Sequence, residues 1–231
     1  MITEVMRVCG LTADELCGRL SDFAEKGVSF SVEELCLDAR ITMTGDLDPK
    51  SFDAVRSLAY NALGDEVYAA DDTPLNVLAA QLLAMNGKKL AVAESLTGGE
   101  ICSRLTAVPG ISANFYEGVV CYDRGSKESR LGVPKALLGA YGAVSRETAY
   151  AMVRGLLRPP VDIGLATTGL AGPAGDEGKP VGLVYIAVGA GDFITVFEKH
   201  LHGDRNTVRA SAANLALFYL VRYLKGDILR L

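Results

Sequence analysis

Short apolar runs that alternate with segments of helical periodicity constrain the fold of this chain most strongly. Three of the runs are apolar along nearly their whole length, which is typical of strands buried on both faces of a sheet. They cover residues 89–93, 118–122 and 163–168. Helical patterns follow the first two runs and precede the third, and a last one covers residues 204–224. This alternation predicts a three-layer α/β/α domain.

Two further strand patterns, residues 183–188 and 193–197, are separated by only Gly-Ala-Gly-Asp. A connection this short joins antiparallel neighbours, whereas parallel neighbours need a crossover of a dozen residues or more. The last two strands therefore form a hairpin, and we expect the sheet to be mixed.

The first 72 residues have a different pattern, which predicts a small α+β domain. Thr12 and Glu15 resemble a capping box at the start of one helix, and residues 49–63 predict a second. Between them, residues 28–32 and 35–43 alternate in polarity like two strands. An acidic segment with a proline, residues 64–76, separates this region from the next helix. We place the boundary near residue 72, which gives domains 1–72 and 73–231.

Composition excludes several classes of function. The net charge of −5 disfavours a broad nucleic-acid or membrane surface, and no apolar run approaches the roughly 18 residues that span a bilayer. Five cysteines never form a CxxC pair, which predicts reduced thiols in a cytoplasmic protein. The two histidines lie two residues apart, which rules out a His-rich metal centre. We expect neither a metal nor a cofactor.

The segment AESLTGG, residues 93–99, lies where a buried strand ends and a helix begins. Ser95 is well placed there to attack a carbonyl, and Thr97 has the same chemistry. Free N–H groups at Gly98, Gly99 and Glu100 could stabilise an oxyanion or hold a phosphate. The alternative is structural, with Ser95 or Thr97 as the N-cap of the helix and the glycines as its turn.

A nucleophilic serine needs a base, and Lys127 is the best candidate. It follows the apolar run 118–122 at the start of a helix, where the helix dipole disfavours a positive charge. Tyr122 could shuttle a proton or orient the lysine. The alternative for Lys127 is a solvent-facing helix residue. His200 and His202 fit a solvated strand end better than a catalytic base.

Two later segments complete the candidate site. Thr168 ends the run 163–168 and leads into a Gly/Pro-rich loop that could wall a small anionic pocket, or could be a surface loop. Arg205 and Arg209 open the last helix four residues apart, which suits an anion, or pairing with acidic neighbours. Ligands of such sheets bind beyond the carboxyl ends of strands. We therefore expect the loops 94–99, 122–127 and 167–180 to converge.

These segments together resemble the CinA C-terminal family, whose best-known members are bacterial nicotinamide mononucleotide amidohydrolases (PncC). The resemblance covers about residues 74–225, and residues 12–72 resemble the middle segment of full-length CinA proteins. The matching segments are AESLTGG, RLTAVPGISANFYEGVVCYD, LGVP, GAVSRETA, TTGLAGPAGDEGKPVGLVYIAV and GDRNTVR.

The resemblance implies a metal-independent Ser/Lys amidohydrolase that converts nicotinamide mononucleotide to nicotinate mononucleotide and ammonia. It assigns catalysis to Ser95, Lys127 and Tyr122. Substrate binding falls to Thr97, Gly98, Gly99, Thr168, Arg205 and Arg209. The expected ligand is a pyridine mononucleotide, with neither nucleic acid nor membrane as partner and with self-association into a homo-oligomer.

Two segments depart from the family pattern. Leu96 replaces a cysteine, and residues 122–127 read YDRGSK where the family has YSNEAK. Asp123 would raise the pKa of Lys127, Arg124 would lower it, and Gly125 would loosen the helix start. One alternative is therefore a catalytically impaired module that binds a pyridine nucleotide or phosphate. Another is a CinA-like interaction protein that recruits a partner through residues 1–72.

Overall fold

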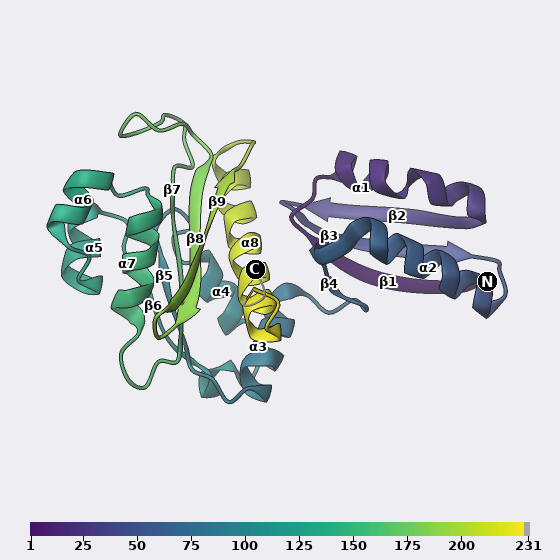
Figure 1. Cartoon of the computed structure of the whole chain (residues 1–231), viewed down its shortest axis with the longest axis horizontal. Helices are drawn as coiled ribbons and strands as arrows, with labels where there is room; N and C mark the ends of the chain where they lie inside the picture. The colour runs from purple at the N-terminus through teal and green to yellow at the C-terminus, as the bar shows by residue number, and fades with distance from the viewer. Residues whose placement is uncertain (229–231) are drawn as a thin grey trace. The chain divides into compact units, whose positions relative to one another are not determined.

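The computed structural model describes residues 1–228. The chain forms two compact units, Met1–Leu75 and Asn76–Leu231, which are purple to blue and teal to yellow in Figure 1. The sequence prediction placed this division three residues earlier. None of the helices in the described part of the chain is long and apolar enough to cross a bilayer.

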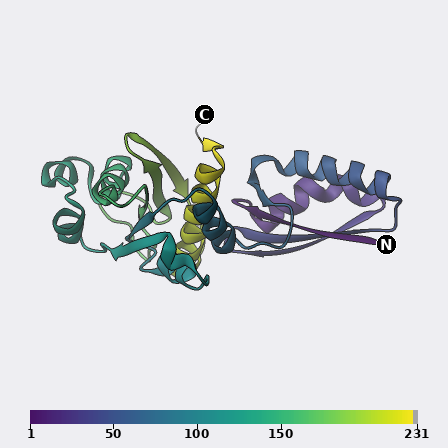
Figure 2. The ribbon, with the colours of Figure 1, turned by 90° about the horizontal axis from the view of Figure 1, so that it is seen from below.

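The N-terminal unit is a four-stranded antiparallel sheet with strand order β2-β3-β1-β4. Two helices, α1 and α2, cover the same face of it (Figure 2). This chain order and strand order define the split β-α-β arrangement of ferredoxin-like domains. Its elements are β1 (Ile2–Cys9), α1 (Ala13–Leu20), β2 (Val28–Leu35), β3 (Asp38–Gly45), α2 (Pro49–Leu63) and β4 (Val67–Ala69).

Local sequence explains both helices of this unit. The capping box predicted at Thr12 and Glu15 is present, since each side chain accepts from the other residue's backbone N–H. The Asp48 side chain caps α2 by accepting from the N–H groups of Lys50 and Ser51, and Pro49 occupies the first turn, where a missing N–H costs nothing. The predicted bounds of α2, residues 49–63, are those observed.

Two strands of this unit were not predicted. The order expected from the sequence was helix, strand pair, helix, whereas β1 lies in the middle of the sheet between β3 and β4. Glu4 and Arg7 weaken the apolar signal of β1, of which Met6 and Val8 are buried. The hairpin of β2 and β3 turns at Cys36 and Leu37, which both have positive φ, as a two-residue type I′ connection requires.

The second unit contains the mixed five-stranded sheet that the sequence predicts, with strand order β6-β5-β7-β8-β9. The first three strands in this order are parallel, and β8 and β9 are antiparallel to their neighbours. The strands are β5 (Leu90–Glu94), β6 (Phe115–Val120), β7 (Ile163–Gly169), β8 (Leu183–Ala190) and β9 (Phe193–His200). The helices are α3 (Leu75–Met85), α4 (Glu100–Thr106), α5 (Arg124–Leu131), α6 (Lys135–Tyr141), α7 (Arg146–Leu156) and α8 (Arg205–Lys225).

Helices cover both faces of this sheet, which confirms the three-layer prediction. On one face α7 packs against β5, β7, β8 and β9, with α5 and α6 packed on α7. On the other face α8 packs against β7 and β8, and α4 against β5 and β6. The helix α6 was not predicted, because it is only 7 residues long and contains Gly139.

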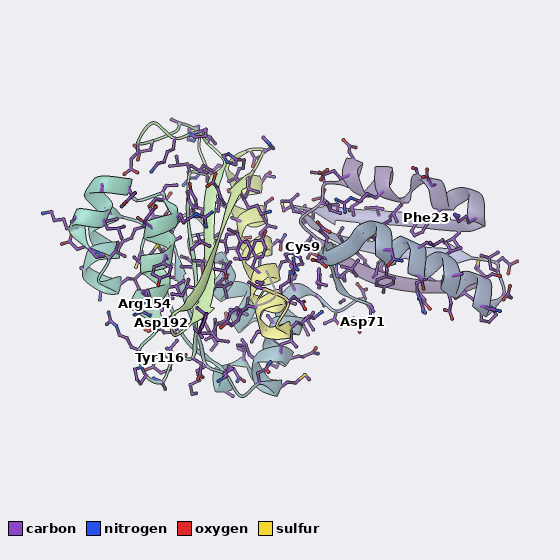
Figure 3. The ribbon with its side chains drawn as sticks, in the orientation of Figure 1. Cys9, Phe23, Asp71, Tyr116, Arg154 and Asp192 are labelled. Atoms are coloured by element: carbon purple, nitrogen blue, oxygen red, sulfur yellow. The ribbon has the colours of Figure 1, made fainter. Side chains whose placement is uncertain are left out.

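The register sets where a site can form. Ala93 pairs with Val119 on one side and with Ala166 on the other, so the carboxyl ends of β5, β6 and β7 lie side by side. At the opposite end of the sheet, Arg154 of α7 forms an ion pair with Asp192 of the β8–β9 turn (Figure 3). Ligands of such sheets bind beyond the carboxyl ends of strands, and Ser95 and Lys127 follow β5 and β6 at that end.

Candidate active site

Ser95 and Lys127 are in direct contact at the carboxyl ends of β5 and β6. The Lys127 Nζ lies 2.9 Å from the Ser95 Oγ. Ser95 follows β5 and still pairs with β7, since its N–H donates to the Thr167 carbonyl. Lys127 lies in the first turn of α5, which begins a few residues after β6. The parallel pairing of the two strands therefore brings together two side chains that are 32 residues apart in sequence.

Lys127 is buried, with 1% of its surface exposed. Its amine also contacts the carbonyl oxygens of Cys121 at 2.7 Å and Tyr122 at 3.3 Å. A neutral amine has two N–H donors and one lone pair. If the two carbonyls accept its two protons, the lone pair is left for the hydroxyl of Ser95.

Burial lowers the pKa of Lys127, because desolvation penalises the ammonium form. Cys121, Asp123 and Glu177 act in the opposite direction. Asp123 thus has the sign expected from the YDRGSK segment, but the net direction is downward. The Asp123 carboxylate also accepts from the N–H of Gly125 at 2.7 Å and so caps the helix that carries the lysine.

A cavity of about 290 Å³ opens in front of this pair. All three loops expected to converge contribute to its walls, which confirms that part of the prediction. Its lining includes Ser95, Leu96, Tyr122, Lys127, Ala143, Val144, Thr168, Leu170, Ala174, Asp176 and Arg205.

Tyr122 and Arg205 meet at this cavity. The Arg205 guanidinium donates to the phenol oxygen of Tyr122 at 2.6 Å and to the Gly172 carbonyl. The side chain of Tyr122 is therefore bonded to Arg205, and only its main-chain carbonyl contacts Lys127. This arrangement suits a role for Tyr122 in orienting Lys127 and Arg205 better than proton transfer.

Thr97 and Thr168, both buried, have their hydroxyls engaged within the protein. Thr168 lines the cavity, but its hydroxyl donates to the Ala143 carbonyl at 2.7 Å. Its oxygen can still accept a hydrogen bond from a ligand in the cavity. Thr97 shares a hydrogen bond of 2.9 Å with Thr167 and is not part of the cavity lining.

The N–H groups at Gly98, Gly99 and Glu100 are not free, which corrects the expectation that they form an oxyanion hole. Gly98 donates to the Ser95 carbonyl and Glu100 to the Thr97 carbonyl. Gly99 donates to the carboxylate of Glu94 at 2.9 Å. The glycines have positive φ, so they serve to close the turn.

The two arginines of α8 differ in position, although the sequence places them on one helix face. Arg205 lines the cavity. Arg209 instead donates its Nε to the Leu96 carbonyl and one Nη to the Thr97 carbonyl, both at 3.0 Å. The expectation that both face an anionic ligand is thus corrected for Arg209, whose guanidinium holds the loop after Ser95.

Sequence reasoning missed two acidic residues. Glu94 is fully buried and accepts from the N–H groups of Gly99, Ile101 and Cys102. Glu177 accepts from the Ala143 N–H and lies 3.5 Å from Arg124. A carboxylate directly before a Ser-x-x-Gly-Gly turn and a helix start was a usable signal for Glu94, since helix N-termini attract negative charge. Nothing in the sequence links residues 124 and 177.

The fold and the Ser–Lys pair define a three-layer α/β/α domain with a serine-centred cavity at the carboxyl ends of its parallel strands. The family model of the CinA C-terminal domain matches residues 72–224. This chain belongs to the CinA family.

Relatives and solved structures agree with this membership. The chain is similar to a CinA-like protein of Geobacter sulfurreducens, 36% identical over 231 residues, which cover 96% of this chain and 56% of the relative. It is also similar to a CinA-like protein of Fusobacterium nucleatum, 43% identical over 172 residues, which cover 73% of this chain and 42% of the relative. The chain thus spans about half the length of the curated relatives it matches.

A crystal structure of a competence-damaged protein (CinA) superfamily protein from Escherichia coli superposes with a TM-score of 0.63 at 32% identity. The match covers 67% of this chain and 93% of that one. A competence/damage inducible protein from Agrobacterium tumefaciens gives a TM-score of 0.61 at 35% identity, covering 65% and 95% of the two chains. Each match covers about two thirds of this chain, which is the size of one of its domains.

Proposed function

We propose that the second unit hydrolyses the carboxamide of nicotinamide mononucleotide by a Ser/Lys mechanism, releasing ammonia and nicotinate mononucleotide. The observation that carries the proposal is the 2.9 Å contact between the Ser95 hydroxyl and a buried Lys127. A lysine whose pKa is lowered by burial has the property that a serine's general base requires. The choice of substrate rests on the resemblance to the family.

In the first half of the reaction, the Ser95 Oγ attacks the carboxamide carbon while its proton passes to the Lys127 amine. The carbonyl π electrons move to oxygen and form a tetrahedral oxyanion. When this intermediate collapses, the C–N bond breaks, and the leaving nitrogen takes the proton from the Lys127 ammonium. Ammonia departs, and the acyl group remains as an ester on Ser95.

In the second half, water attacks the ester carbon and gives its proton to Lys127. The C–O bond to Ser95 then breaks, and Lys127 returns the proton to the Ser95 oxygen. Nicotinate mononucleotide leaves, and both residues regain their starting protonation. The mechanism consumes one water and needs no metal.

The main-chain N–H of Leu96 is the candidate oxyanion donor. The Ser95 carbonyl accepts from Gly98 inside the turn, and in a trans peptide the next N–H points the opposite way. Leu96 lines the cavity, and no hydrogen bond within residues 1–228 uses its N–H. The residue after the nucleophile is the usual donor in serine hydrolases with a strand–turn–helix nucleophile.

Arg205 is the candidate partner of the substrate phosphate. It is the one guanidinium among the described residues that lines the cavity, and arginine binds phosphate through paired N–H donors. The phenol of Tyr122 holds it from one side and the Gly172 carbonyl from the other. Binding without turnover was the alternative reading of the YDRGSK segment. The retained contact between Lys127 and Ser95 favours hydrolysis.

The test is ammonia release from nicotinamide mononucleotide by the full chain. Wild type should release one ammonia per nicotinate mononucleotide formed, and Ser95→Ala and Lys127→Met should lose at least about 10³-fold in kcat. Exposed residues of the same types give matched controls, Ser103→Ala and Lys135→Met, which should keep wild-type activity. An inactive wild type at high enzyme concentration would reject this substrate, and tight binding without product would favour the binding module.

A further inference from the structure

Two buried or partly buried charged side chains hold the turn after the nucleophile, one through N–H groups and the other through carbonyl groups. Where the turn enters α4, the Glu94 carboxylate accepts hydrogen bonds from three backbone N–H groups at distances of 2.8–3.2 Å. Arg209 donates hydrogen bonds to the carbonyls of Leu96 and Thr97. Neither side chain lines the cavity. Both therefore act on the loop's backbone and make no contact with a ligand in that cavity.

We propose that Glu94 and Arg209 are positioning residues that fix the Ser95 hydroxyl and the Leu96 N–H for attack, and we name the pair the loop clamp. This inference rests on the proposed function and deepens it. It reassigns Arg209 from ligand binding to the geometry of the nucleophile loop.

Arg209 bonds two consecutive carbonyl groups of the turn, those of Leu96 and Thr97. Both residues are buried, and although the Thr97 carbonyl also accepts from the Glu100 N–H, loss of Arg209 would leave the Leu96 carbonyl in need of a solvent partner. One planar guanidinium satisfies both of them. A lysine at 209 has a single rotating ammonium and cannot reproduce this two-point contact.

Glu94 places a buried carboxyl group at the start of α4. Glu94 is 0% exposed, and a buried carboxylate is tolerated only when hydrogen bonds compensate its lost hydration. Three N–H donors at the start of α4 provide this compensation. These hydrogen bonds also keep the three N–H groups from turning toward the cavity. The Leu96 N–H is therefore the donor that remains beside Ser95.

The clamp acts at atoms adjacent to the reaction. Glu94 is bonded through the chain to Ser95, and Arg209 fixes the peptide group that follows Leu96. A displacement of about 1 Å at a reacting group can cost about 10²-fold in rate. Loss of either side chain is therefore expected to lower kcat while leaving KM nearly unchanged, because the cavity wall that binds substrate is intact.

The experiment compares Arg209→Met, Arg209→Lys and Glu94→Gln with Arg205→Met, which lies one helical turn away. For the clamp variants we expect kcat to fall about 10- to 100-fold with KM within about twofold of wild type. Arg209→Lys should recover only part of the loss. Arg205→Met should instead raise KM. If Arg209→Met raises KM as Arg205→Met does and keeps kcat, Arg209 binds the ligand and the proposal is overturned.

A second readout does not depend on the natural substrate. A fluorophosphonate probe phosphonylates an activated serine, forming a P–O bond as fluoride leaves, so its labelling rate at Ser95 reports the nucleophile and its oxyanion donor alone. Clamp variants should label about 10- to 100-fold more slowly, and Arg205→Met at the wild-type rate. Labelling of wild type without turnover of nicotinamide mononucleotide would reject the substrate and leave the clamp testable. Equal labelling of all variants, or none of the wild type, would overturn the clamp.

Amide hydrogen exchange distinguishes a local loss of order in the turn from general unfolding of a variant. Peptides covering residues 95–102 should exchange faster in the clamp variants, with peptides from β7 and β8 unchanged. Faster exchange throughout the second unit would show general unfolding, and the milder Arg209→Lys then carries the kinetic comparison. Unchanged exchange at residues 95–102 in both Arg209 variants would contradict the clamp.

Discussion

Replacing Lys127 by methionine removes the titrating amine, so the free energy of unfolding of the variant reports the pKa of the buried lysine independently of catalysis. Methionine keeps an unbranched chain of similar length at a site where only 1% of the lysine surface is exposed. Burial lowers the pKa of the folded-state lysine below the ordinary value of 10.5. The unfolded chain therefore binds more protons than the folded chain between the two pKa values.

The sign of the resulting pH effect follows directly. The free energy of unfolding of wild type rises with pH in that window, by up to about 1.4 kcal/mol per pH unit for one proton. Lys127→Met lacks the titrating group, so the stability of the variant relative to wild type must fall as pH rises. All other titrating groups occur in both proteins and cancel in the difference.

Urea unfolding followed by circular dichroism at pH values from 6 to 10.5 measures this difference. Because the chain has two compact units, the comparison uses the unfolding transition that the substitution moves. Lys135→Met, an exposed lysine in α6, serves as the control and should show a flat difference. If the stability of Lys127→Met relative to wild type stays flat or rises with pH, the pKa of Lys127 is not lowered and the amine is not a neutral base.

Three further outcomes test separate parts of the account. Arg205→Met should raise KM for nicotinamide mononucleotide about 10- to 100-fold with a smaller change in kcat, because a charge-assisted hydrogen bond contributes about 1.5–3 kcal/mol. Steady-state kinetics measures both constants, and an unchanged KM would argue against a phosphate contact. Asp123→Asn keeps the helix cap but removes a charge that raises the pKa of Lys127, so the acid limb of kcat/KM should move to lower pH; a shift to higher pH contradicts this. A Cβ at Gly118 would lie 2.2 Å from the Cys102 sulfur, so Gly118→Ala should destabilise by about 1–3 kcal/mol. Its control, Gly139→Ala in open space within α6, should stabilise by about 0.4–1 kcal/mol, and equal melting shifts would reject the steric argument.

The central strands of the second unit were predictable because they are buried and leave strong apolar runs, whereas the edge strands β6 and β9 are exposed or only partly buried. Parallel β5 and β7 are buried along nearly their whole length, so their runs read clearly in the sequence. The strand β1 buries mainly its C-terminal half and carries Glu4 and Arg7, so its alternation was too weak to read. Pairing across the sheet, which gives β1 its central place, depends on contacts that local periodicity does not report.

The Ser95–Lys127 contact could be anticipated for a topological reason. Both residues follow strands that are parallel neighbours, and the carboxyl ends of such strands meet. The sequence alone left Lys127 open as a solvent-facing residue, since its helix is short and polar. Its burial comes from the turn of the side chain back toward the Cys121 carbonyl.

The division of labour between Arg205 and Arg209 could not be read from spacing. Four residues put both on one helix face, but they also separate them by about 6 Å along the axis. That distance is enough for one guanidinium to reach the cavity and the other to reach the carbonyls of Leu96 and Thr97. Only the packing of α8 beside α4 determines which arginine does which.

The central claim is that Ser95 carries the acyl group during turnover. Acid quenching of the full chain during steady-state turnover of nicotinamide mononucleotide, followed by mass spectrometry of the peptide that contains Ser95, tests it directly. The account predicts an ester of the nicotinoyl mononucleotide on Ser95, absent from Ser95→Ala and from protein without substrate. Ammonia release that continues in Ser95→Ala, with no adduct on the wild-type peptide, would contradict it.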